Sequence, residues 1–171
     1  MEWGMQRAAR MAIIECKCLL QNREWEETKT MKTVREVMTT QVDYCTPLDN
    51  VFEAAVKMRD LNVGAIPIVE NGEIVGMVTD RDLVVRGIAE KRPGSSQITE
   101  VMTRNVMAIS PDLSVQEAAQ QMAKQQIRRL PVVEHNKLIG IISLGDLATN
   151  EASDESAGQA LTSISEQHIV D

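Results

Sequence analysis

Aromatic residues are scarce in this sequence of 171 residues. They make up 2% of the chain and number four: Trp3, Trp25, Tyr44 and Phe52. So few rings exclude the aromatic platform on which single-stranded nucleic acids stack. An excess of positive charge is also lacking, because the net charge is −7 and residues 150–171 carry five acidic residues and no basic one. Nucleic acid is therefore not expected among the partners, since binding it requires a basic stripe or patch.

Long apolar runs are absent as well. No stretch reaches the length of about 18 apolar residues that a transmembrane helix needs. The apolar stretch over residues 11–20 is interrupted by Glu15 and Lys17, so it is a poor signal peptide. We therefore expect a cytoplasmic protein with no membrane partner. The cysteines are odd in number and lack a C-x-x-C spacing, which favours neither a disulfide framework nor a metal site: Cys16, Cys18 and Cys45.

An internal repeat is the strongest feature that the sequence does contain. The tripeptide Val37-Met38-Thr39 recurs 64 residues later as Val101-Met102-Thr103, and no gap is needed from residue 37 to residue 83. Because a unit of about 50 residues buries little surface alone, the two copies are expected to pack as one body. The same offset aligns these further pairs: Pro47 with Pro111, Glu53-Ala54-Ala55 with Glu117-Ala118-Ala119, Pro67 with Pro131, Gly76 with Gly140, and Asp82-Leu83 with Asp146-Leu147.

Each copy has the pattern of a β-α-β-β-α unit. A short apolar strand precedes apolar residues at helical spacing, and a hairpin and a second helix follow. Asn71-Gly72 is a strong signal for a type I′ turn, and His135-Asn136 stands at the same place in copy two. Copy one is predicted to have a strand over 42–45, a helix from 51 that ends at Gly64, strands over 66–69 and 74–78, and a helix from 79 to about 89. Copy two is predicted to have a strand over 106–109, a helix over 113–124, strands over 130–133 and 138–142, and a helix from Ser143.

This pattern predicts an α+β (mixed α/β) fold in which two pseudo-symmetric repeats pack through their sheets. We place repeat 1 at 34–90 and repeat 2 at 97–150, joined by a linker rich in turn-forming residues. Residues 1–30 lie outside the repeat and form an N-terminal extension that could be helical, since Met31 looks like a natural start. Residues 151–171 are either an acidic helix or a frayed tail.

Both copies close their hairpin with a motif that has two interpretations. A strand ends at Thr79 or Ser143, a helix begins, and an aspartate follows three residues later, Asp82 or Asp146. The first interpretation is a capping box, in which hydroxyl and carboxylate satisfy free backbone N–H groups. The second is a ligand site, because a helix start favours a phosphate and a carboxylate can accept from both hydroxyls of a ribose. The two are compatible, since capping uses only part of a carboxylate's acceptor capacity.

Together these motifs resemble a tandem pair of CBS domains, the Bateman module. The resemblance covers about residues 34–150 and is closest to small bacterial proteins made of one CBS pair. It implies a homodimer in the form of a flat disc, with adenosyl ligands such as AMP, ADP, ATP or S-adenosylmethionine in the cleft between the copies. It also implies that Thr79 and Asp82 hold phosphate and ribose in one site, and Ser143 and Asp146 in the other. The residues that match adenine-binding positions are Val42, Val106, Gly64 and Ala65.

Basic residues distinguish the two implied sites. Arg128 and Arg129 take the place of Gly64 and Ala65 in copy two, where members of the family often have a basic residue that reaches a phosphate. Adjacent side chains of a strand point to opposite faces, so only one of the two arginines is expected to enter the cleft, the alternative being that both are solvated. Phosphate preference is predicted to be stronger where either can reach. Arg81 is a further candidate, with a surface position as its alternative.

Signatures of catalysis are missing from the sequence. Neither G-x-x-x-x-G-K-[ST] nor G-x-G-x-x-G occurs, and His135 and His168 belong to no nucleophile or metal constellation. We therefore expect a non-catalytic sensor without a cofactor, whose regulatory ligand is an adenine nucleotide or S-adenosylmethionine. The alternatives are a protein-interaction scaffold with decayed sites, in which the two caps are only caps, and the regulatory subunit of a separate enzyme.

Overall fold

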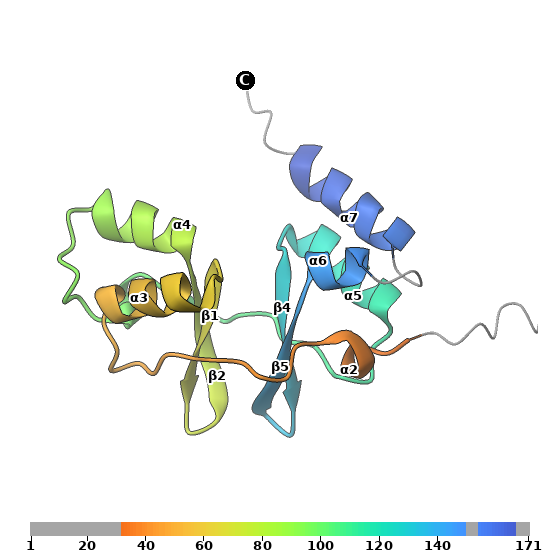
Figure 1. Cartoon of the computed structure of the whole chain (residues 1–171), viewed down its shortest axis with the longest axis horizontal. Helices are drawn as coiled ribbons and strands as arrows, with labels where there is room; N and C mark the ends of the chain where they lie inside the picture. The colour runs from red at the N-terminus through yellow and green to blue at the C-terminus, as the bar shows by residue number, and fades with distance from the viewer. Residues whose placement is uncertain (1–31, 150–153, 167–171) are drawn as a thin grey trace, which may run out of the picture. The chain divides into compact units, whose positions relative to one another are not determined.

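In the computed structural model, residues 32–149 and 154–166 are described. They belong to one compact unit that runs from Lys32 to Asp171. The predicted extension over residues 1–30 lies outside the described residues, and so do residues 150–153 and 167–171. The fold is the expected mixed α+β arrangement, with two small antiparallel sheets and helices beside them (Figure 1).

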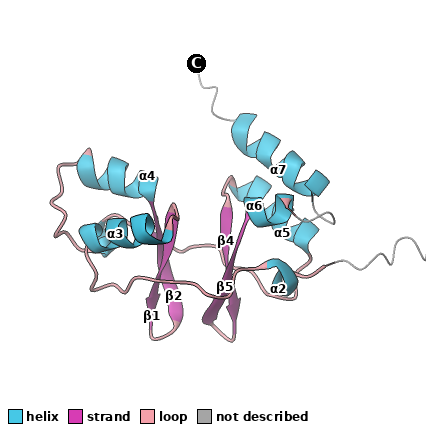
Figure 2. Cartoon of the chain, in the orientation of Figure 1, coloured by secondary structure: helices cyan, strands magenta, loops and turns pink. Residues whose placement is uncertain are grey.

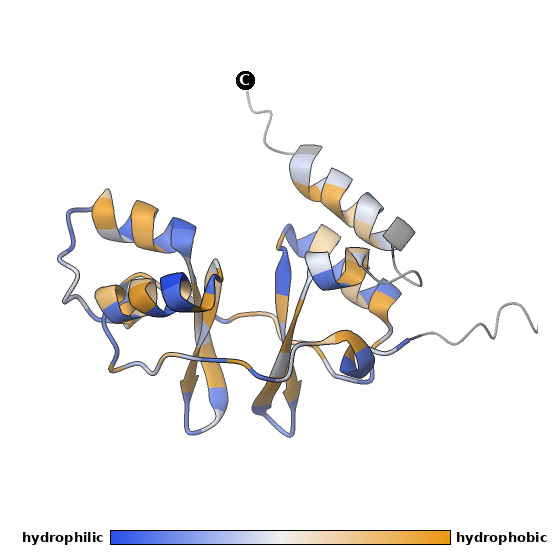
Figure 3. Cartoon of the chain, in the orientation of Figure 1, coloured by the Kyte–Doolittle hydropathy of each residue, from blue (hydrophilic) through white to orange (hydrophobic). Residues whose placement is uncertain are grey.

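Two β-hairpins form the centres of the repeats. In repeat 1, β1 (Ala65–Glu70) pairs with β2 (Glu73–Thr79), and in repeat 2, β4 (Arg129–Glu134) pairs with β5 (Lys137–Ser143). Figure 3 shows the strands coloured mostly hydrophobic and the turns between them hydrophilic. The two hairpins predicted from the sequence are confirmed, because both two-residue turns have the positive φ angles of a type I′ turn: 53° at Asn71, 87° at Gly72, 50° at His135 and 64° at Asn136.

Each repeat has a long helix before its hairpin and a further helical segment after it, which spans residues 80–88 in repeat 1 and 144–148 in repeat 2 (Figure 2). Complete capping boxes begin the two long helices, α3 and α5, which fixes where they start. The described helices are, in chain order, α2 (Val34–Val37), α3 (Val51–Leu61), α4 (Asp80–Asp82), the π-helical η1 (Leu83–Ile88), the 3₁₀-helical η2 (Ile98–Glu100), α5 (Val115–Gln125), α6 (Leu144–Ala148) and α7 (Asp154–Glu166).

Two helix boundaries differ from the prediction. Helix α3 ends at Leu61 rather than at Gly64, because Asn62 adopts the left-handed conformation, with φ of 52°, and ends the helix. Helix α5 begins at Val115 rather than at residue 113, because Ser114 is the N-cap and its hydroxyl accepts from the backbone N–H of Glu117 at 3.2 Å.

The first strand that was predicted in each copy is not formed. Over residues 42–45 only Cys45 pairs with β1, in a parallel bridge, and over residues 106–109 only Ile109 pairs with β4. In copy one the reason lies just before the predicted strand, where Thr39 forms an antiparallel bridge with β5 of repeat 2. A segment that crosses from one sheet to the other cannot pair along its whole length with either of them.

The leading segments, residues 32–39 and 97–104 at the N-terminal ends of the two repeats, are exchanged. Residues 32–39 stand at the start of repeat 1 but pack on repeat 2, where Val34 of α2 is fully buried in the core of α5, β4 and β5. Residues 97–104 stand at the start of repeat 2 but pack on repeat 1, where Ile98 of η2 is fully buried and β3 (Thr103–Arg104) pairs with β2. The N–H groups of Val34 and Ile98 each donate to the main chain of the repeat that they cover, at 2.8 and 2.9 Å. Neither core is complete without a segment from the other half of the chain.

Helix α7 belongs to the core of repeat 2. Its residues Ala157, Ala160 and Ile164 are buried against α5 and α6, while Leu161 is 47% exposed. The corresponding face of repeat 1, on α3 and η1, leaves apolar side chains exposed. The two repeats therefore differ most in what covers their helices.

Two glycines allow the exchanged segments to approach the sheets closely. A methyl group at Gly140 would lie 2.7 Å from Sδ of Met38 and 3.0 Å from the carbonyl oxygen of Thr39. A methyl group at Gly76 would lie 2.7 Å from Sδ of Met102 and 2.9 Å from the carbonyl oxygen of Thr103. These are closer than a β-carbon can approach without displacing a neighbour, so glycine is required at both aligned positions.

We expect Gly140→Ala to lower the free energy of unfolding by about 1–3 kcal/mol, as overpacking does when a backbone atom must move. Urea denaturation followed by circular dichroism measures this. The control is Gly158→Ala in α7, where no atom lies within 4 Å of the added methyl group. That change is expected to be neutral or to stabilise by up to about 1 kcal/mol. Equal urea midpoints for Gly140→Ala and the unchanged protein would contradict the close approach.

Candidate functional site

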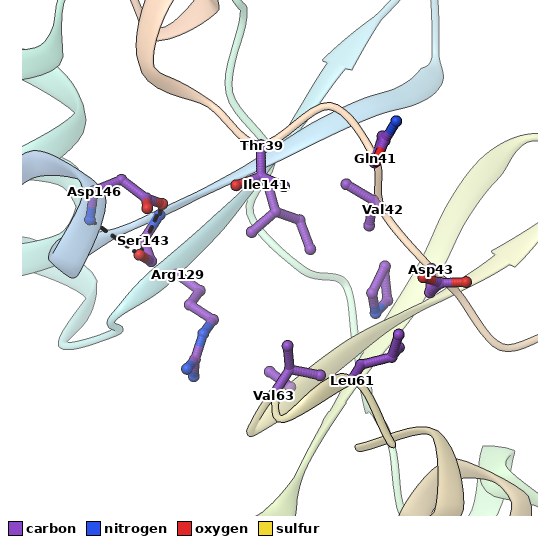
Figure 4. Close-up of a pocket in the computed structure, with 12 residues that line it drawn as sticks. Thr39, Gln41, Val42, Asp43, Leu61, Val63, Arg129, Ile141, Ser143 and Asp146 are labelled. Atoms are coloured by element: carbon purple, nitrogen blue, oxygen red, sulfur yellow. Dashed lines mark hydrogen bonds between the residues drawn. The ribbon is translucent and has the colours of Figure 1, made fainter. Parts of the chain in front are cut away.

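A cavity of about 340 Å³ lies between the repeats (Figure 4). This volume is near the lower end of the range of about 300–1,000 Å³ that is usual for small-molecule sites. Repeat 1 and the segment leading into it contribute part of the lining, and β4, β5 and α6 contribute the rest. The lining residues are Thr39, Gln41, Val42, Asp43, Leu61, Val63, Ala65, Pro67, Arg129, Ile141, Ser143 and Asp146.

The cap of α6 forms one end of this cavity. Strand β5 ends at Ser143, whose hydroxyl and backbone N–H both donate to Oδ2 of Asp146, at 2.8 and 2.7 Å. The backbone N–H of Asp146 donates in return to Oγ of Ser143 at 3.2 Å. The capping interpretation is therefore confirmed here. Oδ1 of Asp146 accepts from no residue in the described part of the chain, so one carboxylate oxygen stays available to a ligand.

The cap of α4 has the same geometry but a different surrounding. The hydroxyl and backbone N–H of Thr79 donate to Oδ2 of Asp82 at 2.7 and 3.0 Å. Oδ1 of Asp82, unlike its counterpart, lies 3.5 Å from Nη1 of Arg86. Neither Thr79 nor Asp82 lines the cavity. The two caps thus begin their helices in the same way. They differ in the second carboxylate oxygen, which lies near Arg86 in Asp82 and has no partner among the described residues in Asp146.

Apolar side chains line much of the cavity. Val42 and Ala65, which the resemblance assigns to adenine, are among them. Leu61 and Val63, which sequence analysis did not select, also line it, although they are 42% and 39% exposed. Their position could have indicated them, because Leu61 and Val63 flank Asn62, at the end of α3 and outside its row of buried residues. Apolar residues at such a place favour contact with some further surface or ligand.

Residues 39–43 contribute three more residues that sequence analysis did not select for the site: Thr39, Gln41 and Asp43. Only Asp43 lies in the strand that was predicted over 42–45, and Thr39 was noted only as part of the repeated tripeptide. In Figure 4, Asp43 lies across the cavity from Asp146 and Ser143.

Arg129 is the arginine that reaches the cavity. Arg129 is half-buried and lines the cavity, whereas Arg128 is exposed and does not line it. Arg128 lies just before β4, which begins at Arg129. A β-carbon at Gly64 would lie 3.9 Å from Nη1 of Arg129 and 3.1 Å from Oδ2 of Asp80, so Gly64 keeps space beside this guanidinium.

The structure thus brings together some of the predicted site residues and not others. The cavity combines the adenine positions of repeat 1 with the cap of repeat 2, because the leading segment crosses between them. The predicted residues that line it are Val42, Ala65, Arg129, Ser143 and Asp146. The predicted residues that it leaves out are Thr79, Arg81, Asp82, Gly64, Val106 and Arg128.

Other kinds of chemistry find little support in the described part of the chain. No group of three or more His, Cys, Asp and Glu residues there could hold a metal ion. His135 is an exposed turn residue. Cys45 is fully buried, and this burial raises the pKa of its thiol, so the reactive thiolate is disfavoured at neutral pH. Within the described ranges, no helix has the length and apolar character to cross a membrane.

Two bacterial proteins match this chain over most of its length. The uncharacterized protein YlbB of Bacillus subtilis is 54% identical over 138 residues, which are 80% of this chain and 93% of YlbB. The CBS domain-containing protein YhcV of the same organism is 50% identical over 139 residues, 81% of this chain and 99% of YhcV. Both are thus similar to this chain across nearly all of their own length.

A solved structure and a family model agree with these matches. The CBS domain pair of protein MJ0100, in complex with 5′-methylthioadenosine and S-adenosyl-L-methionine, is 28% identical with a TM-score of 0.63, and the match covers 69% of this chain and 94% of that one. The model of the CBS domain matches residues 34–87 and 98–153. The chain therefore belongs to the CBS-domain family, as a tandem pair of these domains.

Proposed function

We propose that this protein is a regulatory sensor that binds an adenosyl ligand in the cavity between its repeats. The observation that carries the proposal is the free Oδ1 of Asp146 in a cavity with apolar walls from the opposite repeat. In addition, the domain pair of MJ0100 was solved with two adenosyl compounds bound. The role that we propose is non-catalytic, because the matches cover 93% of YlbB and 99% of YhcV and leave no room in either for a separate catalytic domain.

In this proposal each part of the ligand meets a matching surface. The ribose hydroxyls donate to Oδ1 of Asp146, which the cap holds in place through Oδ2. Val42 and Ala65 contact the adenine ring, and the guanidinium of Arg129 binds an anionic group of the ligand. Binding would fix the leading segment against repeat 2, and a partner protein would detect that state.

The charge of the lining favours some adenosyl ligands over others. Arg129 is its only basic residue, while Asp43 and Asp146 are both acidic. Each further phosphate brings negative charge toward carboxylates without a second guanidinium to pair with it. Within the adenosyl class we therefore favour a monophosphate, or a compound such as S-adenosylmethionine with a single carboxylate, over ATP.

A thermal-shift panel of 5′-methylthioadenosine, S-adenosylmethionine, AMP and ATP tests the proposal. Ligand at 100 times Kd stabilises by about 2.7 kcal/mol, which is about 5–10 °C for a chain of this size. We expect such a shift with at least one ligand, and its loss in Asp146→Ala.

Asp82→Ala is the matched control, because it removes the same kind of cap but lies outside the cavity. It should lower the melting temperature of the free protein and keep the ligand shift. No shift with any ligand in the unchanged protein would favour the alternative, an interaction scaffold in which both aspartates are only helix caps.

We also propose that two copies form a homodimer through the uncovered face of repeat 1. Apolar side chains on α3 and η1 are at least half exposed there, whereas α7 covers the corresponding helices of repeat 2. Exposed apolar residues gathered in this way are typical of an interaction surface. The residues are Phe52, Val84, Val85 and Ile88.

Light scattering coupled to size exclusion measures the assembly. The unchanged protein should have twice the chain mass of 19.0 kDa. Phe52→Ser combined with Ile88→Ser should give the monomer mass, because polar hydroxyls on both helices weaken an apolar interface. Leu161→Ser, at an exposed apolar residue of α7, should leave the dimer intact. A monomeric unchanged protein, or dimers in all variants, would contradict this interface.

A further inference from the structure

The internal offset of 64 residues aligns residues that line the cavity with residues of the other half of the pair, and we call the place of those aligned residues the counterpart. Thr39 and Asp146 line the cavity, and the residues aligned with them are Thr103 and Asp82. If the two halves were equivalent, the counterpart would offer a second set of the same binding groups. The contacts of these aligned residues decide whether it does.

In the cavity these groups are unengaged. Among the described residues, none donates a hydrogen bond to Oδ1 of Asp146 or pairs with the hydroxyl of Thr39. In the counterpart, one side chain engages both groups. Nη1 of Arg86 donates to Oγ1 of Thr103 at 3.2 Å and lies 3.5 Å from Oδ1 of Asp82.

Further contacts hold Arg86 in this position. Nη1 lies 3.1 Å from the carbonyl oxygen of Val101 and 3.2 Å from that of Met102, in the segment exchanged onto repeat 1. The position of Arg86 in η1, four residues after Asp82, places the two side chains on neighbouring turns. The sequence has Asn150 at the position aligned with Arg86, a shorter and uncharged residue. The arginine is thus particular to one half of the chain.

The guanidinium competes for the same atoms as a ribose would. The guanidinium lies at ion-pair distance from Oδ1 of Asp82, the atom to which a ribose hydroxyl would donate, so a ligand gains little there unless Arg86 moves away.

We propose that Arg86 substitutes for the ligand in the second half of the pair, so that each chain binds one adenosyl molecule instead of two. This inference rests on the proposed function, since it presupposes binding at Ser143 and Asp146. It assigns to Arg86 a role in setting stoichiometry. Replacing it by the residue that the other repeat carries should open the second site.

Isothermal titration calorimetry with 5′-methylthioadenosine and, separately, S-adenosylmethionine measures the number of sites per chain. We expect one site in the unchanged protein and two in Arg86→Asn. Adding Asp82→Ala to Arg86→Asn should return the number to one. Arg92→Asn is the control: it removes another arginine that pairs with a carboxylate, that of Glu100, away from Asp82, and should leave one site.

The outcomes separate the two proposals. No binding of either compound, or of AMP or ATP titrated in the same way, to the unchanged protein contradicts the proposed function itself. One site in both the unchanged protein and Arg86→Asn, or two sites already in the unchanged protein, leaves the proposed function intact and overturns the role of Arg86. If Arg86→Asn does not fold, Arg86→Gln replaces it, because glutamine can still donate to the carbonyl oxygens of residues 101 and 102 without a charge at Asp82. One site in that folded variant overturns the inference equally.

Discussion

The exchange of leading segments between the repeats is the constraint on which the rest of this structure depends. Val34 completes the core of repeat 2 and Ile98 completes that of repeat 1, each fully buried. Because Thr39 is then bridged to β5 and Cys45 to β1, the chain between them must cross from one hairpin to the other. That crossing places Val42 and Asp43 in the wall of the cavity. The candidate site is therefore a product of the exchange and not of either repeat alone.

The departures from pseudo-symmetry that bear on the proposals lie in three places. The hairpins, the caps and the glycines at 76 and 140 are equivalent between the halves, and they serve the fold. The differences lie elsewhere: Arg129 stands opposite Ala65, Arg86 pairs with Asp82 only, and α7 covers only repeat 2. Duplication accounts for the shared scaffold, and these differences make the two halves structurally distinct.

Local features of the fold could be predicted from the sequence. The turn at Asn71-Gly72 and the caps at Thr79 and Ser143 depend on residues within three positions of one another, and all of them are present in the structure. The strands over 42–45 and 106–109 were wrong because their pairing is decided by distant partners. Alternation and propensity carry no information about which sheet a segment will meet.

The site could be predicted only in part for the same reason. The motif correctly marked Ser143 and Asp146 as cap residues, and both line the cavity, as does only one of the two adjacent arginines, Arg129. That Val42 lines the same cavity as the cap of repeat 2 follows from the path of the crossing segment, which the sequence motifs do not indicate. The difference between Asp82 and Asp146 arises from the position of one side chain, that of Arg86, and could be seen only in the structure. Neither is encoded in the spacing of the motifs.

The exchanged segments also set the order in which this chain can fold during synthesis. The core of repeat 1 lacks Ile98, Val101 and Met102 until the ribosome has passed the linker, and Val34 has no core to enter until repeat 2 has emerged. Contacts between residues 34 and 115–147 are far apart in sequence, which slows folding relative to a chain of independent units. Repeat 1 can therefore complete its core once residue 102 has emerged, whereas the core of repeat 2, which extends to Ile164 of α7, is complete only near the end of translation.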